Sequence, residues 1–255
     1  MRFAVVIPAR MGSTRLPGKP LAELLGKPLV LHVAERARAS GAERVLVATD
    51  DERICAACVA AGVEARLTGA HHVSGTDRIA EVSEQCGWDA SDIVVNLQGD
   101  EPLMPPATIR QVAALLDGRE QADLATLCTP IHSLEEFLSP NAVKLVMDQS
   151  GRALYFSRAP IPWNREGAAA GFASQQRWQG ALRHLGLYAY RVGALRRLAA
   201  TPPCELEQIE KLEQLRALWL GMVIAVSVAR EAPGPGVDTP EDLQRVAALL
   251  KNRPA

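Results

Sequence analysis

The chain has 255 residues, of which 48% are hydrophobic and 22% are charged, and its formal net charge is −1. This composition is typical of a globular protein with a buried core and excludes a disordered or fibrous chain. A net charge so close to zero excludes bulk attraction to nucleic acid or to anionic membranes, so phosphate groups must be bound by a local cluster of cations.

Two further properties concern the location of the protein. No apolar run reaches the roughly 18 residues that a membrane span needs, and the short apolar stretch at residues 3–7 is followed by arginines rather than by a secretory hydrophobic region. The five cysteines are an odd number scattered along the chain, which argues against a disulfide framework. We therefore expect a cytoplasmic protein that binds neither membranes nor nucleic acid.

The first half of the chain alternates strand and helix signals. The predicted elements are a strand at 4–7, a helix at 28–39, a strand at 45–48, a helix capped by Asp50 or Asp51, a strand at 93–97 and a helix at 105–116. The strand segments are continuously apolar, as in a parallel sheet that is buried on both faces. This order predicts an α/β fold with a mostly parallel, Rossmann-like sheet flanked by helices, in which ligands bind beyond the carboxyl ends of the strands.

The second half is less regular and richer in strands. Its predicted elements are strands at 143–146 and 186–190, a mobile loop at 167–176, a helix at 206–220, a strand at 222–228 and a final helix at 240–250. We therefore predict a nucleotide-binding α/β core at 1–123, a smaller mixed-sheet part at 124–205 and a C-terminal segment at 206–255 that returns to the core.

A basic loop at residues 8–20 follows the first predicted strand. It carries Arg10, Arg15 and Lys19 together with two glycines. Glycines let backbone amides approach a polyphosphate closely, and arginine and lysine neutralise its oxygens. The loop is not a Walker A motif, because Pro20 stands where the hydroxyl residue should follow the lysine. Such a loop could instead face solvent, but its place after a buried strand favours phosphate binding.

Two acidic residues stand at comparable places. Asp100 follows the strand at 93–97, and Asp238 precedes Thr239–Pro240, a pair that predicts an N-cap with proline at the first helical position. Magnesium prefers one or two protein carboxylates together with phosphate oxygens and water. Each aspartate could instead serve only to cap a helix.

These segments and others resemble the CTP-dependent sugar-acid cytidylyltransferases, and among them the Kdo cytidylyltransferases. The segments that carry the resemblance are 7–10, 13–20, 48–50, 74–78, 95–102, 140–144, 153–158, 183–188, 212–216 and 236–243. The resemblance implies transfer of CMP from CTP to the anomeric hydroxyl of Kdo (3-deoxy-manno-octulosonate), with release of pyrophosphate, for lipopolysaccharide synthesis. It also implies Mg²⁺ as cofactor and a homodimer, with sugar binding and dimerisation in the smaller part.

The resemblance further implies a role for individual residues. The triphosphate would be held by Arg10, Arg15 and Lys19, and the base and ribose by Pro8, Ala9, Ser74, Gly75, Thr76 and Arg78. Magnesium would be bound by Asp100 and Asp238, and the sugar acid by Gln98, Arg158, His184, Tyr188 and Glu210. The catalytic set would be Arg10, Lys19, Asp100 and Asp238. Before the loop serine the family often has an aromatic and a small residue, where this chain has Met11–Gly12.

Several alternatives stay open at this level. His184 could be a satisfied strand histidine, and Glu207 with Glu210 could form a solvated helix face. The acceptor could be another sugar acid, such as amino-Kdo or sialic acid, or the chain could be a regulatory protein that binds CTP without catalysis. We assign no site to Cys55–Cys58, which lies in an apolar helix, or to His71–His72, which fits a polar loop.

Overall fold

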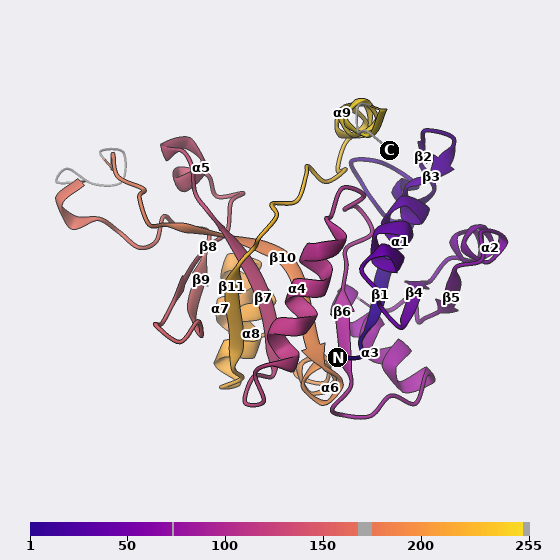
Figure 1. The fold of residues 1–255 in the computed structure, drawn as a ribbon, viewed down its shortest axis with the longest axis horizontal. Helices are drawn as coiled ribbons and strands as arrows, with labels where there is room; N and C mark the ends of the chain where they lie inside the picture. The colour runs from indigo at the N-terminus through magenta and orange to yellow at the C-terminus, as the bar shows by residue number, and fades with distance from the viewer. Residues whose placement is uncertain (73, 168–174, 252–255) are drawn as a thin grey trace.

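The computed structural model describes residues 1–72, 74–167 and 175–251. Figure 1 shows a central sheet with helices on both faces. The sheet has nine strands in the order β11-β7-β10-β6-β1-β4-β5, and β8 and β9 join it beside β10. Its strands are β1 (Ala4–Ala9), β4 (Arg44–Thr49), β5 (Glu64–Leu67), β6 (Ile93–Asn96), β7 (Leu124–Pro130), β8 (Lys144–Met147), β9 (Ala153–Ser157), β10 (Leu182–Arg191) and β11 (Ile224–Val228). The short strands β2 (Glu23–Leu24) and β3 (Lys27–Pro28) form a separate antiparallel pair.

The helices lie between these strands along the chain. They are α1 (Leu29–Ala39), α2 (Glu52–Ala60), α3 (Gly75–Gln85), α4 (Pro106–Asp117), α5 (Leu134–Leu138), α6 (Val192–Ala199), α7 (Glu205–Glu210), α8 (Gln214–Trp219) and α9 (Pro240–Lys251), with 3₁₀ turns η1 (Lys19–Leu21) and η2 (Arg165–Gly167). Within the described part of the chain, no helix combines the length and the apolar character that a membrane crossing requires.

The sheet is mostly parallel, as the sequence predicts. β1 runs parallel to β4 and to β6, β4 runs parallel to β5, and β11 runs parallel to β7. β10 lies antiparallel between β6 and β7, and β8 with β9 forms an antiparallel extension. The predicted α/β class, with a small mixed region added to the parallel core, is therefore confirmed.

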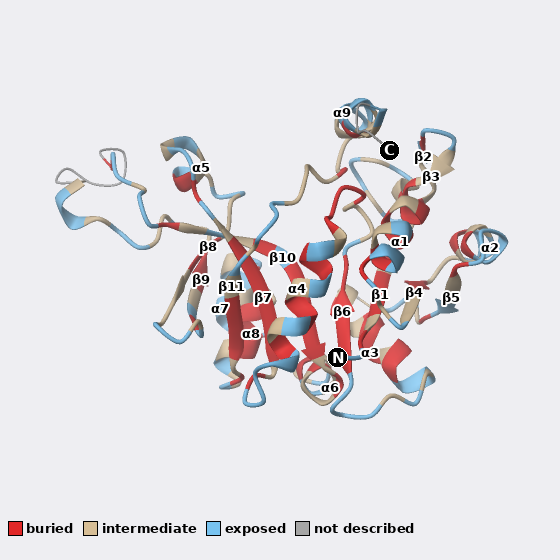
Figure 2. Ribbon diagram, viewed as in Figure 1, coloured by how far each residue is buried: buried red, intermediate tan, exposed pale blue. Residues whose placement is uncertain are grey.

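Both faces of the opening strand are covered. Val5 and Ile7 pack in the core that α1 and α4 complete, whereas Val6 points to the opposite core beside Ile79 of α3. This alternation follows from the two-residue period of a strand. Figure 2 shows the buried sheet between partly exposed helices. The end of β1 is consequently a rigid support for the basic loop.

One predicted element is wrong as a continuous helix. The segment 206–220 forms α7 and α8, which are separated at Lys211 because this residue adopts a left-handed conformation with φ 53. The turn brings Arg216 of α8 onto Glu207 of α7 at 2.7 Å and places Leu212 and Leu215 in the core. The break between α7 and α8 is therefore stabilised by a nearly buried ion pair and by the burial of two leucine side chains.

The predicted parts of the chain share this one sheet. Strands from residues 1–123, 124–205 and 206–255 all belong to it, and the division into a nucleotide-binding core, a smaller part and a returning segment stays a prediction. Of the predicted mobile loop at 167–176, residues 168–174 lie outside the described residues.

Candidate functional site

The first wall of the site is the loop that joins β1 to η1. β1 ends at Ala9, and the loop closes at Gly18, whose φ of 68 is a left-handed conformation that glycine adopts without strain. Gly18 directly precedes η1, which begins with Lys19. The side chain of Lys19 is 16% exposed, so the loop presents a largely buried ammonium group at the carboxyl edge of the sheet.

Lys19 joins two acidic residues from distant parts of the chain. Its Nζ lies 2.7 Å from Oδ2 of Asp100 and 3.0 Å from Oδ1 of Asp238. A guanidinium nitrogen of Arg15 lies 3.1 Å from the same oxygen of Asp238. All four side chains line one cavity of about 370 Å³, which we call the first cavity. The convergence that the sequence predicts is confirmed, whereas the roles of these residues stay predictions.

Asp238 reaches this cavity because the segment after β11 crosses back over the core to α9 (Figure 1). The N–H of Val237 donates to the carbonyl oxygen of Asp100 at 2.9 Å. Thr239 caps α9: its Oγ1 accepts from the N–H of Asp242 at 3.2 Å, and the Asp242 carboxylate accepts from the N–H groups of Asp238 and Thr239. The predicted N-cap is confirmed, and it leaves the Asp238 carboxylate for the cavity.

The electrostatics of this corner favour an added positive charge. Partial burial opposes the charge of Lys19, but Asp100 and Asp238 outweigh it and raise the pKa of Lys19 above 10.5. Burial, reinforced by the charge of Asp100, raises the pKa of the neighbouring Glu101 to about 7. The negative charges of Asp100 and Asp238 add to this rise, and the negative potential that they create stabilises a cation.

The rest of the first cavity matches most of the predicted nucleotide-binding set. Of that set, the cavity is lined by Pro8, Ala9, Arg10, Arg15, Lys19, Ser74, Gly75 and Arg78. Thr76 instead faces a neighbouring cavity and donates its hydroxyl to Glu213. Further lining residues, to which the sequence assigned no role, are Gly12, Ser13, Thr14, Pro20, His72 and Gly99. All of these except His72 lie in the basic loop at 8–20 or in the segment 95–102, so their place in these motifs could have indicated that they line the site. His72 lies outside both segments.

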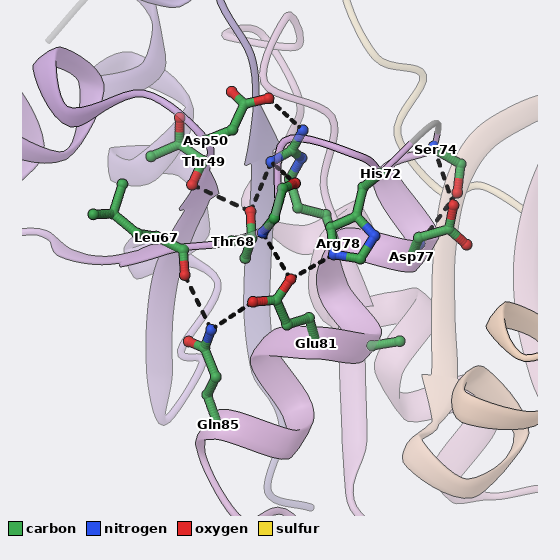
Figure 3. Close-up of polar contacts among 12 residues, drawn as sticks. Thr49, Asp50, Leu67, Thr68, His72, Ser74, Asp77, Arg78, Glu81 and Gln85 are labelled. Carbon is green, nitrogen blue, oxygen red and sulfur yellow. Dashed lines mark hydrogen bonds and ion pairs between the residues drawn. The ribbon is translucent and has the colours of Figure 1, made fainter.

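The first turn of α3 fixes the opposite wall (Figure 3). Ser74 and Asp77 form a capping box, in which Ser74 Oγ accepts from the N–H of Asp77 at 3.1 Å and Asp77 Oδ2 accepts from the N–H of Ser74. Arg78 is buried and donates to Asp50 Oδ2 at 2.8 Å and to Thr68 Oγ1 at 2.6 Å. In this structure Arg78 therefore ties α3 to the ends of β4 and β5.

A second cavity of about 230 Å³ adjoins the first and shares Gly75 and Gln98 with it. It is lined in part by Tyr188 and Gln214, whose Oη and Nε2 atoms are buried and lack a hydrogen-bond partner within the described residues. A buried polar atom without a partner is costly, and a bound polar molecule would remove that cost. The second cavity thus has the character of a site for a polar ligand.

Three of the five predicted sugar-binding residues lie in this region. Gln98 lines both cavities, and Tyr188 lines the second. His184 lines a third cavity, of about 160 Å³, to which Gln98 also contributes. The His184 ring lies 5.2 Å from the ring of Tyr188, and its Nε2 lies 3.0 Å from Oγ1 of Thr126.

The other two predicted sugar-binding residues bind each other elsewhere. The Glu210 carboxylate accepts from Ser157 Oγ at 2.6 Å and from the N–H of Arg158 at 2.8 Å. The Arg158 guanidinium donates to the carbonyl oxygens of Glu210 at 2.6 Å and of Pro140 at 2.8 Å. Neither side chain lines the three cavities described above. The predicted sugar-binding set is therefore not assembled around one cavity in this structure.

Glu213 and Gln214 line the second cavity but were not predicted to bind a ligand. A continuous helix over 206–220 would have made Glu207 and Glu210 the notable carboxylates. The left-handed turn at Lys211 starts a new helix, and the residues at its start face the sheet instead. The segment 212–216 contributes to the family resemblance, which was the signal available for these residues.

The burial of His184 predicts a loss of stability in acid. Burial, with the nearby charge of Arg183, lowers the pKa of His184 from 6.5 to about 3. The unfolded chain regains the ordinary pKa, so it takes up the proton first, and stability is lost as the pH falls below 6.5. By about pH 5 this should amount to about 2 kcal/mol of the free energy of unfolding. Urea unfolding at about pH 7.5 and pH 5 should show a smaller loss in His184→Gln; an equal loss in both proteins would refute the assignment.

Comparison with known proteins identifies the class. A family model described as cytidylyltransferase matches residues 4–224, so the chain belongs to the cytidylyltransferase family of nucleotidyltransferases. Enzymes of this kind typically use a divalent metal.

The chain is also similar to proteins of known structure. The chain is 42% identical to a CMP:2-keto-3-deoxy-manno-octonic acid synthetase whose structure holds CTP, with a TM-score of 0.87 over 98% of this chain and 99% of that one. A cytidylyltransferase from Leptospira borgpetersenii is 17% identical over 100% of this chain and 89% of that one, with a TM-score of 0.64. A 4-diphosphocytidyl-2C-methyl-D-erythritol synthase is 15% identical over 98% and 99%, with a TM-score of 0.63. The last two share the fold.

Proposed function

We propose that the chain transfers CMP from CTP to the anomeric hydroxyl of Kdo and thereby activates the sugar for lipopolysaccharide synthesis. The observation that carries the proposal is the meeting of Lys19, Asp100 and Asp238 at one cavity. The 42% identity to a synthetase of this specificity over almost the whole chain supports it. The sugar oxygen forms a bond to the α-phosphorus, the bond between the α-phosphorus and the bridging oxygen breaks, and pyrophosphate leaves while the hydroxyl proton passes to solvent.

The chain's own residues would position the reactants and balance charge. Arg10, Arg15 and Lys19 lie where they can neutralise a triphosphate and the negative charge that develops on the departing pyrophosphate. Capping hydrogen bonds fix the turns on either side of the cavity, which limits the ordering needed when the reactants bind. Positioning and charge neutralisation are the main protein contributions to phosphoryl transfer.

Mg²⁺ fits the two carboxylates. Asp100 and Asp238 place oxygens within 3.0 Å of one ammonium nitrogen, so both can address a single cation. Within the described residues no group of three or more His, Cys, Asp or Glu side chains could hold a metal, so the other ligands of the ion would have to be phosphate oxygens and water. When bound, the ion supplies positive charge at the phosphates.

We place the sugar acid in the second cavity. Tyr188 Oη and Gln214 Nε2 are free to bind its hydroxyl or carboxylate oxygens, and Gln98 stands between this cavity and the first. Roles for Arg158, His184 and Glu210 stay predictions, and Arg158 would have to leave its carbonyl partners before it could bind a carboxylate.

The sugar site can be tested by removing one hydroxyl. Tyr188→Phe should raise the KM for Kdo by about tenfold, the value of about one buried hydrogen bond, and leave the Kd for CTP unchanged. Steady-state kinetics and calorimetry measure the two quantities. Tyr155→Phe removes a hydroxyl from β9 outside the second cavity and serves as the matched control. A normal KM for Kdo in Tyr188→Phe would place the sugar elsewhere.

Pyrophosphate release decides the function itself. We expect release with CTP and Kdo in the presence of Mg²⁺, and much less with ATP, GTP or UTP, or without the metal. Release with amino-Kdo or sialic acid but not with Kdo would change the acceptor. CTP binding without release from any acid would make the chain a nucleotide-binding regulator.

We further propose a cytoplasmic homodimer that forms through the smaller part of the chain. All five cysteines are free, which suits a reducing compartment. Leu154 on β9 of this part is an exposed apolar side chain, and so are Leu206 and Ile209 on α7 of the C-terminal segment. This helix is hydrogen-bonded to β9 through Glu210 and Ser157, so the three exposed side chains together support a contact surface that also includes α7. Light scattering would report the mass, and a monomer at micromolar concentration would contradict the proposal.

A further inference from the structure

The connection between β5 and α3 contributes part of the wall of the first cavity. His72 and Ser74 of this connection line the cavity, together with Gly75 at the start of α3. The triphosphate needs the cations of the basic loop, so the base of a bound nucleotide has to reach a less basic part of the wall. The connection supplies such a part, and its polar groups are candidates for reading the base.

Side chains on one face of α3 hold this connection in place (Figure 3). Glu81 Oε2 accepts from the N–H of Gly69 at 2.9 Å. Gln85 Nε2 donates to the carbonyl oxygen of Leu67 at 3.0 Å and to Glu81 Oε1 at 2.9 Å. Arg78, on the preceding turn, donates to Thr68. These bonds hold residues 67–69 of the connection against α3.

The orientation of the His72 ring is set by a direct contact with Glu81. Its Nε2 is paired with Glu81 Oε2, and its side chain is 13% exposed. Burial opposes the charge of Glu81, but the N–H of Gly69 and the ring of His72 outweigh it and hold the pKa of Glu81 below its ordinary value. A carboxylate can only accept hydrogen bonds, so Nε2 must carry the proton. In the neutral ring Nδ1 then has a lone pair and is an acceptor.

We propose that His72 is a specificity-determining residue whose Nδ1 accepts a hydrogen bond from the 4-amino group of cytosine, and that Glu81 is the positioning residue that fixes its tautomer. This inference rests on the proposed use of CTP. Uracil carries an oxygen at the same position, so UTP would set one lone pair against another and leave a buried acceptor unpaired. His72 would then distinguish the two pyrimidine bases.

Nucleotide binding without sugar acid tests the role of His72. Calorimetry at about pH 8.5, above the range in which an imidazole ordinarily titrates, should show His72→Ala binding CTP about tenfold more weakly and UTP almost unchanged, so that the preference falls about tenfold. His71→Ala is the matched control, because His71 is an exposed neighbour whose ring lies 4.3 Å from that of His72 and which does not line the first cavity. An unchanged CTP/UTP ratio in His72→Ala would overturn the inference.

The positioning role of Glu81 has a readout of its own. Imidazole ¹⁵N spectra of the wild type should show His72 as the Nε2–H tautomer, assigned by comparison with His72→Ala. Glu81→Gln can still accept from Gly69 but no longer dictates the tautomer, so the two forms should mix and the CTP preference should fall severalfold with little change in Tm. A wild-type Nδ1–H tautomer would refute the role.

Failure of this inference can be distinguished from failure of the proposed function. If the wild type binds no CTP, the proposed function is wrong. If it binds CTP and His72→Ala leaves the CTP/UTP ratio unchanged, only the inference about His72 is wrong.

Discussion

Asp100→Asn is expected to lower the turnover of CTP and Kdo by about 10²-fold or more, the usual effect of removing one group that stabilises developing charge. The substitution keeps the shape of the side chain and removes its charge. Lys19 retains Asp238, and the backbone bond from Val237 to the Asp100 carbonyl oxygen does not involve the side chain. The loss should therefore come from the binding of the metal and the phosphates, and we expect the Mg²⁺ concentration at half-maximal rate to rise in parallel.

The control for this change is Asp117→Asn. Asp117 is an exposed residue at the end of α4, away from the three cavities, and its substitution changes the net charge by the same amount. Its turnover should match the wild type. Near-normal turnover in Asp100→Asn, or a large loss with an unchanged Mg²⁺ dependence, would remove Asp100 from the metal site.

The acidic pair could be predicted from sequence because each aspartate lies beside a strong local signal. Asp100 follows a strand whose apolar run is continuous. Asp238 precedes Thr239 and Pro240, which are typical of the N-cap and of the first position of a helix. Parallel strands bring their carboxyl ends to the same edge, so the fold class then implies that such loops meet. Asp100 and the basic loop meet in this way, because β6 and β1 are parallel neighbours. Asp238 comes from the segment after β11, a strand at the far end of the sheet, and reaches the same edge because that segment crosses back over the core (Figure 1).

The second cavity could not be predicted in the same way. Its polar lining depends on Lys211, a residue with no intrinsic preference for the left-handed conformation that ends α7 and turns Gln214 towards the sheet. Helical periodicity cannot reveal such a break, because both sides of it read as good helix. The contact of His72 could not be predicted either, because its partner Glu81 lies on α3, a helix that the sequence pattern did not predict.

Lys19→Met should also lower turnover by about 10²-fold or more, and in addition should change how the free protein responds to metal. In the free protein the ammonium group neutralises Asp100 and Asp238. Methionine has a similar length and no charge, so Asp100 would lose its ammonium partner and Asp238 would keep only its ion pair with Arg15. A divalent cation then no longer competes with an ammonium group, and Mg²⁺ alone should raise the Tm of the variant clearly more than that of the wild type.

Lys27→Met provides the comparison, because Lys27 pairs with Glu35 on the surface and lies outside the first cavity. It should show normal turnover and the wild-type response to Mg²⁺. If Lys19→Met loses turnover but Mg²⁺ does not stabilise it, the lysine binds phosphate without sharing a cation site with the two aspartates. If its turnover is normal, the ammonium group serves the fold rather than the reaction. These results test whether the place between Asp100 and Asp238, which the Lys19 ammonium group occupies here, is taken by a metal ion when nucleotide binds.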